Sequence, residues 1–134
     1  MDYIGVCAII ENSDKKILVE NHKKLAGLSL PGGKCERGED PKYAIIRELK
    51  EELGIIVTDL TLIDVKMYKD IPYPKITGET ANFNEYLFEI NKFTGEITNK
   101  EPLKHPELLW LSKEELEDRE DNTIILNDYI KRIL

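Results

Sequence analysis

The sequence predicts a single α+β domain in which helices cover a mixed β-sheet. Its 134 residues suffice for one domain with one core, but not for two domains of ordinary size. Segments rich in β-forming residues alternate with segments of helical periodicity. No internal repeat or low-complexity linker interrupts this order. We therefore expect residues 1–134 to form one domain.

Two β-rich runs open the chain. Residues 3–10 and 16–21 are joined by a polar Glu-Asn-Ser-Asp segment, which is typical of a turn, so the pattern predicts a β-hairpin. The LSLPGG segment that follows, residues 28–33, contains Pro31 and two glycines. We expect it to interrupt regular structure.

A helix is predicted over residues 41–53. Asp40 can accept hydrogen bonds from the first free amides, and Pro41 loses nothing at the first helical position. Gly54 can adopt the left-handed conformation that ends a helix.

This helix has two distinct faces. Its apolar residues fall within an arc of about 100°, the width of a core-facing stripe: Ile45, Ile46, Leu49 and Leu53. Glu48, Glu51 and Glu52 occupy a second arc centred roughly 120° away. The carboxylates therefore flank the buried stripe, where a helix can border a cleft.

The second half of the chain continues the alternation. Residues 55–68 and 83–90 read as strands, with a Pro- and Gly-containing loop at residues 70–80 between them. Residues 108–111 form a short apolar segment, and Ser112 with Glu115 forms a capping box for an acidic helix. Residues 122–134 are expected to form an amphipathic helix with basic residues in its last turn.

Composition excludes several classes of partner. The net charge of −7 argues against a surface that binds a nucleic-acid polymer, which would need basic patches. No apolar run approaches the roughly 20 residues that span a bilayer, and no signal segment opens the chain. We expect a cytoplasmic protein without membrane contact, in which Cys7 and Cys35 are ordinary thiols.

The acidic turn needs an explanation. Like charges four residues apart repel by roughly 0.2–0.5 kcal/mol per pair, and a solvated face would tolerate this. However, the Gly32-Gly33 pair can bring backbone close to a ligand, and Glu36 and Glu39 add carboxylates. Carboxylate oxygens suit Mg²⁺ or Mn²⁺. A bound cation would turn the repulsion into a binding site.

The segment 33–55 resembles the signature of the Nudix hydrolases at every fixed position. The matching residues are Gly33, Glu39, Arg47, Glu48, Leu49, Glu51, Glu52, Gly54 and Ile55. LSLPGGK resembles the usual lead-in to this motif, and LLWLSKEEL resembles a strand and helix near the family's C-terminus. The chain looks closest to the small MutT-like members. The resemblance implies a Nudix-like α/β/α sandwich with a mixed sheet between helices.

The resemblance also implies metal-assisted attack of water on a pyrophosphate. It makes Glu48 and Glu52 the direct metal ligands and Glu51 the next candidate, with a backbone carbonyl of Gly32 or Gly33 completing the set. Mg²⁺ or Mn²⁺ would be the cofactor.

Other catalytic roles follow from the same resemblance. Arg47 would orient a glutamate through its planar guanidinium, and Glu39 would stabilise the loop and helix. The general base is either a motif glutamate or Glu101, which lies where MutT-like proteins carry a late loop glutamate. Glu85 and Glu107 are weaker candidates.

Substrate contacts are expected from three further residues. Lys34 could meet a phosphate, Tyr73 could stack on a base, and Asn122 could read the base by resemblance to MutT-like proteins. His22 and His105 have no His or Cys partner nearby in the sequence, so we expect surface histidines.

The motif specifies the bond better than the leaving group. We expect a small-molecule nucleotide, with a nucleoside triphosphate cleaved to monophosphate and pyrophosphate. Pro72 and Tyr73 stand together where family markers for ADP-ribose or dinucleoside polyphosphates occur, so ADP-ribose or another nucleotide sugar is the alternative. A degenerate domain that binds nucleotide or metal without catalysis is the non-enzymatic alternative. Many relatives dimerise, but nothing in the sequence marks an interface, so a homodimer stays open.

Overall fold

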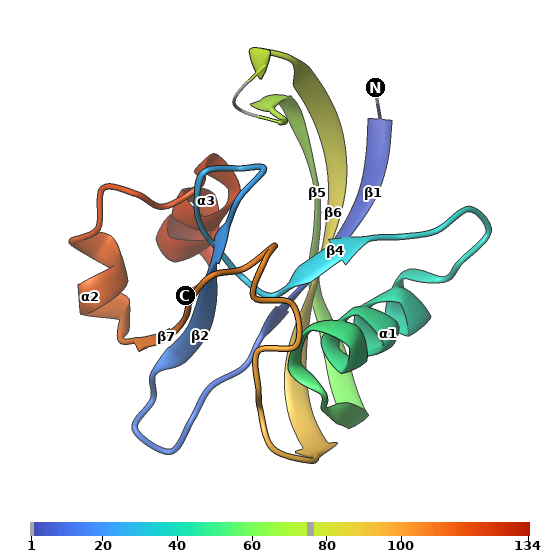
Figure 1. Cartoon of the computed structure of the whole chain (residues 1–134), viewed down its shortest axis with the longest axis vertical. Coiled ribbons are helices and arrows are strands. Elements are labelled where there is room, and N and C mark those ends of the chain that lie inside the picture. The colour runs from blue at the N-terminus through green and yellow to red at the C-terminus, as the bar shows by residue number, and fades with distance from the viewer. Residues whose placement is uncertain (1, 75–76) are drawn as a thin grey trace.

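The computed structural model describes residues 2–74 and 77–134, which form two β-sheets and three helices (Figure 1). The larger sheet has the order β4-β1-β6-β5. Its strands are β1 (Asp2–Ile9), β4 (Gly32–Lys34), β5 (Ile56–Pro72) and β6 (Thr80–Thr94). β1 and β6 run parallel and the other neighbours antiparallel, so the expected mixed sheet of an α+β fold is confirmed.

The predicted hairpin is wrong, because the first two runs belong to different sheets. β2 (Ile17–His22) pairs antiparallel with β3 (Gly27–Ser29) and β7 (Leu108–Leu111) in a second sheet. The turn does form, with an isolated bridge between Glu11 and Ile17. The strands then diverge because both edges of each are taken: β1 by β4 and β6, and β2 by β3 and β7.

The LSLPGG segment is also more regular than expected. The short strands β3 and β4 flank Pro31. In β4, Gly32 pairs with Cys7 and Gly33 with Val6. The double glycine is therefore held at the edge of the larger sheet, beside the acidic helix.

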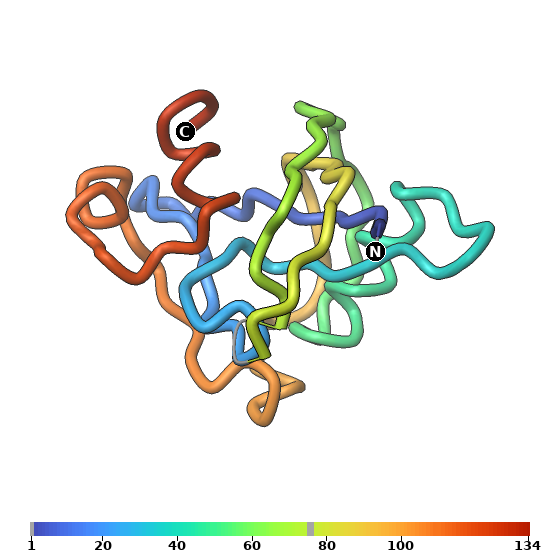
Figure 2. Tube along the Cα trace, turned by 90° about the horizontal axis from the view of Figure 1, so that it is seen from above, coloured from blue at the N-terminus to red at the C-terminus, as the bar shows by residue number. Residues whose placement is uncertain are grey.

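Helix α1 (Pro41–Leu53) has the predicted ends. The Asp40 carboxylate accepts from the Lys42 amide at 2.8 Å, and Gly54 takes the left-handed conformation with φ 72°. Its buried residues are Ala44, Ile45, Leu49, Glu52 and Leu53. In Figures 1 and 2, α1 lies on the opposite side of β1 from the two C-terminal helices. The acidic turn is thereby fixed against the sheet.

β5 and β6 are longer than the sequence indicated. They run to Pro72 and from Thr80, so they take up both ends of the expected loop, whose residues 75 and 76 lie outside the described residues. Register shifts interrupt the β5–β6 pairing, one of them between Tyr68 and Ile71. Such bulges break the two-residue alternation that marks a strand in sequence.

The C-terminal elements follow the prediction closely. Ser112 and Glu115 form the capping box of α2 (Lys113–Glu117), with 3.1 Å from the Glu115 amide to the Ser112 hydroxyl. Helix α3 (Ile124–Arg132) begins two residues later than expected, because Thr123 is its N-cap.

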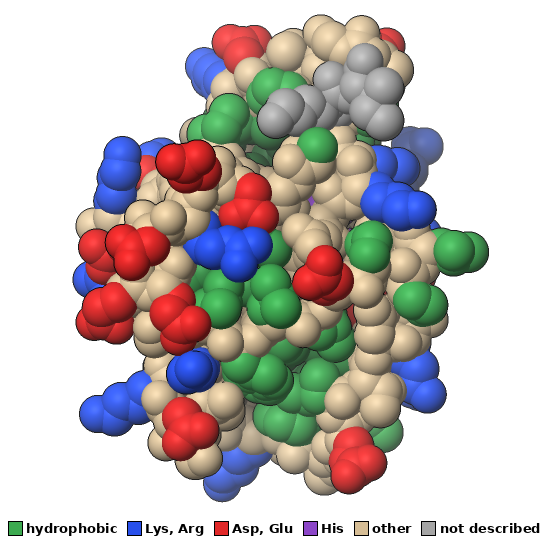
Figure 3. Space-filling model, turned by 60° about the vertical axis from the view of Figure 1, so that its left-hand side comes forward, with side chains coloured by type: hydrophobic (Ala, Val, Ile, Leu, Met, Phe, Trp, Pro, Cys, Tyr) green, Lys and Arg blue, Asp and Glu red, His purple; other side chains and the backbone are tan. Residues whose placement is uncertain are grey.

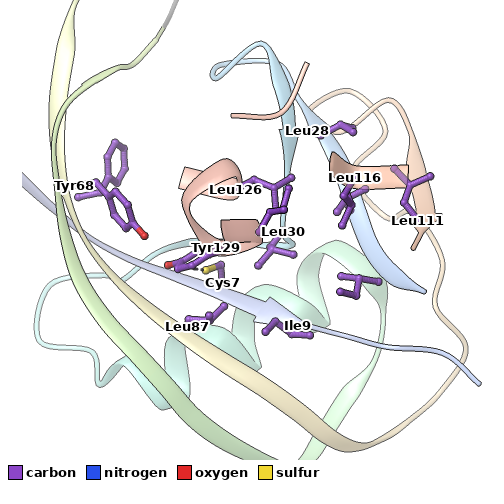
Figure 4. Packing of buried hydrophobic residues seen from close by; sticks show 14 of the residues in the cluster. Cys7, Ile9, Leu28, Leu30, Tyr68, Leu87, Leu111, Leu116, Leu126 and Tyr129 are labelled. Carbon is purple, nitrogen blue, oxygen red and sulfur yellow. Dashed lines mark hydrogen bonds between the residues drawn. The ribbon is translucent and has the colours of Figure 1, made fainter. Parts of the chain in front are cut away.

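The interior has two groups of buried apolar residues. One lies between the two sheets and α3, with Cys7, Leu30, Leu87, Leu126 and Tyr129 among its members (Figure 4). The other lies between the larger sheet and α1. Its buried residues are Val6, Ala8, Ile10, Leu18, Ala44, Ile45, Leu49, Leu53, Ile55, Val57, Phe88 and Ile90. Successive residues of β1 therefore enter the two groups alternately.

Leu49→Ala should destabilise the fold by about 2–5 kcal/mol, because Leu49 is fully buried at the centre of the α1 stripe. Urea unfolding measures this loss. Lys50→Ala, at the exposed neighbouring position, is the control and should stay within about 0.5 kcal/mol of the parent. Equal losses in both variants would contradict the packing described.

The surface is mixed in character. Figure 3 shows one face, where acidic and basic side chains surround an area of hydrophobic side chains. On the sheet face that bears α1, Ile4, Val65 and Met67 are each nearly half exposed. No helix in the described part of the chain is long and apolar enough to cross a membrane.

Candidate active site

One large cavity, of about 780 Å³, brings together most of the predicted site residues. Its wall is built from α1, β1, β4, β6, the loop around Glu101 and the start of α3. The residues of the motif and its surroundings that line the cavity are Gly32, Gly33, Lys34, Glu36, Arg47, Glu48 and Glu52.

Glu48 and Glu52 project from successive turns of α1 toward this cavity. The Glu48 side chain is 15% exposed and that of Glu52 only 3%. Gly33 lies directly against Glu48: a Cβ built on it would stand 2.6 Å from both carboxylate oxygens. Only glycine at position 33 leaves the Glu48 carboxylate in this place.

Arg47 holds the acidic turn in position. Its Nε and Nη2 donate to the two oxygens of Glu39 at 2.8 and 2.9 Å, which confirms the structural role expected of Glu39. Nη1 donates to Glu48 at 3.1 Å, and Nη2 also donates to the Lys34 carbonyl at 3.1 Å. The hydrogen bond from Arg47 lowers the pKa of Glu39 to about 2, so this bidentate pair stays ionised.

Glu52 belongs to a buried group that sequence reasoning missed. His105 lies with Nε2 3.6 Å from Glu52 and Nδ1 3.3 Å from Glu20, so its predicted surface position is wrong. Glu20, Glu52 and His105 are 1%, 3% and 4% exposed. Each offers a ligand atom within 4.8 Å of the others, a spacing that a metal ion could bridge. His22 is half-buried, with its ring 5.2 Å from that of His105.

The loop carrying His105 is fastened to the end of α1. The Lys100 amide donates to the Glu52 carbonyl at 2.8 Å, and the Thr98 amide donates to the Leu53 carbonyl at 3.0 Å. The His105 amide in turn donates to the Glu101 carbonyl at 2.9 Å. These bonds place both Glu101 and His105 beside the acidic turn, although about 50 residues separate them from it in sequence.

The buried group has acceptor atoms without donors. Both carboxylate oxygens of Glu20 and Oε2 of Glu52 lack a hydrogen-bond partner. Burial raises the pKa of both carboxyl groups, and burial lowers the pKa of His105. With the proton of neutral His105 on Nδ1, near the Asn21 carbonyl, Nε2 turns a lone pair toward Glu52. A set of two carboxyl groups and an imidazole fits a divalent cation, which would replace the protons that the carboxyl groups hold without it.

The far side of the cavity mouth is aromatic. Tyr3 stacks on Phe83 with ring centroids 5.3 Å apart, and Tyr73 meets Phe83 edge-on, also at 5.3 Å. The Lys34 ammonium stands over both tyrosine rings, 4.3 Å from Tyr3 and 5.1 Å from Tyr73. The structure thus brings Lys34 and Tyr73 together in the cavity that Glu48 also lines, and a second lysine, Lys24, lies 5.7 Å from the Tyr73 ring.

Two predicted site residues lie outside the cavity wall. Glu51 has a half-exposed side chain that lies 3.3 Å from Arg47. The Asn122 amide nitrogen donates to the Leu116 carbonyl at 2.8 Å, because the residue precedes α3 and turns toward α2. Its neighbour Thr123 lines the cavity instead.

The fold and the setting of α1 against β4 are those of the Nudix class, as the motif had indicated. A family model described as "NUDIX domain" matches residues 1–132. The chain therefore belongs to the NUDIX family.

Individual relatives agree with this assignment. The chain is 33% identical over 113 residues to the CTP pyrophosphohydrolase of Escherichia coli, covering 82% of this chain and 76% of that protein. It is 40% identical over 70 residues to the 8-oxo-dGTP diphosphatase of Proteus vulgaris, so the match spans about half of each protein, 52% and 55%. A MutT NUDIX hydrolase from Burkholderia pseudomallei superposes with a TM-score of 0.79 at 28% identity, covering 100% of this chain and 99% of that one.

Proposed function

We propose that this chain is a Mg²⁺-dependent pyrophosphohydrolase that cleaves a nucleoside triphosphate to the monophosphate and pyrophosphate. The observation that carries the proposal is the convergence of Glu48, Glu52 and Glu101 on one cavity, opposite Lys34 and the aromatic rings. The names of the two enzymes from Escherichia coli and Proteus vulgaris, which both refer to nucleoside triphosphates, support the substrate class.

Glu48 and Glu52 would hold the cation, with the carbonyl of Gly32, a residue of the same cavity wall, as the further ligand. Bound Mg²⁺ would neutralise charge on the pyrophosphate and lower the pKa of bound water. Oε2 of Glu52, which has no hydrogen-bond partner, supports this assignment. Glu51 lies outside the cavity wall and would act indirectly, through its ion pair with Arg47, which also contacts Glu48.

Glu101 would accept the proton of the attacking water. Its side chain is one-quarter exposed, lines the cavity and is 3.2 Å from Lys104. A carboxylate that reaches the cavity from an anchored loop meets the geometric requirement for a general base. Glu48 remains the alternative base from the motif helix.

Lys34 would bind a phosphate, and Tyr73 would lie against the base. Lys34 lines the same cavity as Glu48 and lies over the Tyr73 ring, so a phosphate bound to it would share the cavity with both. The base-reading role of Asn122 stays a prediction from the resemblance, because Asn122 does not line the cavity.

A nucleotide panel tests the proposal. The native chain with Mg²⁺ should release pyrophosphate from CTP or dGTP faster than it cleaves ADP-ribose or diadenosine tetraphosphate. Separation of the products by chromatography identifies which bond is cut. Faster cleavage of ADP-ribose would establish the nucleotide-sugar alternative, and no cleavage of any substrate would contradict the proposal.

Mg²⁺ should raise the melting temperature of metal-free protein, and more at pH 8 than at pH 5. Burial raises the pKa of Glu52 above its ordinary 4.5, so the metal-free protein loses stability as the pH rises from 4.5 through the folded-state value. A cation replaces the protons that the folded carboxyls retain. At a Mg²⁺ concentration 100 times the dissociation constant, binding adds about 2.7 kcal/mol to the free energy of unfolding, which raises the melting temperature by several degrees. Scanning calorimetry with EDTA or Mg²⁺ measures the shift; an equal shift at both pH values would contradict this site.

A further inference from the structure

A carboxyl group that the proposed chemistry does not use lines the floor of the same cavity. Glu85 lies on β6 between Phe83 and Leu87, and its side chain is turned toward the interior with 8% of the residue exposed. Gly5 of β1 is its register partner, and a Cβ built on Gly5 would overlap the Glu85 carboxylate. The missing side chain at Gly5 is what gives the Glu85 carboxyl its place.

This carboxyl has no cationic partner in residues 2–74 and 77–134. Lys66 is its cross-strand neighbour on β5 but pairs with Asp128 at 3.1 Å. The polar side chain facing Glu85 is the Cys7 thiol, which itself lies 3.7 Å from the Tyr129 hydroxyl (Figure 4). Burial raises the pKa of Glu85 to about 7. The Cys7 thiol is only a weak donor, so a ligand that supplies stronger donors would lower the free-energy cost of burying this carboxyl group.

The position of Glu85 and the chemistry of its carboxylate limit which ligand can donate hydrogen bonds to it. Glu85 and the acidic turn face one cavity from different elements, and Phe83, two residues before Glu85, belongs to the aromatic surface. A carboxylate has two adjacent acceptors and no donor. Guanine presents two adjacent donors, N1–H and the 2-amino group. Adenine and cytosine each present one donor beside one acceptor, and the acceptor would face a carboxylate oxygen.

We propose that Glu85 is the base-reading group of this cavity, and that it selects guanine nucleotides by accepting from N1–H and the 2-amino group. This inference rests on the proposed function and names its substrate class. The Glu85 carboxyl already lines the cavity that the proposed substrate would enter.

A substitution that keeps the shape of Glu85 tests the proposal. Glu85→Gln retains one acceptor and turns the other into a donor, which opposes one guanine donor but matches adenine. The ratio of kcat/KM for GTP to that for ATP should fall tenfold or more. Glu89→Gln, on an exposed part of the same strand, is the matched control and should leave the ratio unchanged.

Inosine triphosphate provides the second measurement. It lacks the 2-amino group, so the native chain should prefer GTP over ITP, and Glu85→Gln should reduce that preference. A preference for GTP over ITP that is equal in both proteins would show that Glu85 does not contact the 2-amino group. An unchanged GTP to ATP ratio would overturn the whole inference.

Binding without metal separates this inference from the proposed function. GMP, IMP and AMP are titrated into native and Glu85→Gln protein in EDTA, with heat as the readout. Weaker GMP binding in the variant supports base reading even if no triphosphate is cleaved. Triphosphate cleavage combined with GMP binding that is equal in both proteins would retain the hydrolase and reject the role of Glu85.

Discussion

Glu52→Gln should reduce pyrophosphohydrolysis by about 10²- to 10³-fold, the largest loss that we expect from a single substitution. The amide keeps the size of the side chain but loses its charge. Glu52 is 3% exposed and its Oε2 has no hydrogen-bond partner, so the carboxylate is available to a cation. The measurement is kcat/KM for the preferred triphosphate over a range of Mg²⁺ concentrations.

Stability and neighbouring variants separate this loss from unfolding. Because burial raises the pKa of Glu52, ionising it costs stability at neutral pH, and the metal-free variant should melt no lower than the parent at pH 8. Glu51→Gln should lose less activity, since Glu51 lies outside the cavity. Glu114→Gln, on the exposed surface of α2, should lose none. Full activity of Glu52→Gln would contradict the mechanism.

The sequence predicted the parts of the site whose geometry is local. The ends of α1 depend on Asp40, Pro41 and Gly54, which act within one helical turn. Glu48 and Glu52 are one turn apart, so their common direction follows from helical periodicity alone. The capping box at Ser112 is equally local. Each of these features was confirmed because no distant segment had to be placed.

Residues brought in by long-range pairing were missed or misplaced. Glu20 and His105 meet Glu52 only because β2 pairs with β7 and the loop before β7 is bonded to the end of α1. In sequence, His105 stands alone between Lys104 and Pro106, and neither neighbour gives a signal of burial. Glu20 does carry a signal of burial, because it belongs to the β-rich run that contains Val19. In the structure, the first four residues of this strand, Glu20 included, are all buried. The hairpin failed for a similar reason, because a turn does not determine which sheet each strand joins.

Arg47 is the residue through which this local geometry becomes rigid. One guanidinium contacts Glu39, Glu48 and the Lys34 carbonyl, which lie in the loop, the helix and β4. A lysine has one nitrogen and cannot donate to Glu39 at two oxygens while it also holds Glu48. Arg47→Lys should therefore keep the positive charge at position 47 but no longer orient the Glu48 carboxylate.

The expected result of Arg47→Lys is a fall in kcat of about 10- to 100-fold, with a higher Mg²⁺ concentration needed for half-maximal rate. A misoriented Glu48 binds the cation less well, so excess Mg²⁺ should restore part of the activity, which a merely unstable protein would not show. Glu39→Gln should produce the same Mg²⁺ dependence, and the double variant should lose little more than either single one, because both break the same bidentate pair. Fully additive losses would mean that Arg47 and Glu39 act separately. An unchanged Mg²⁺ requirement would mean that the pair supports the fold but does not orient Glu48.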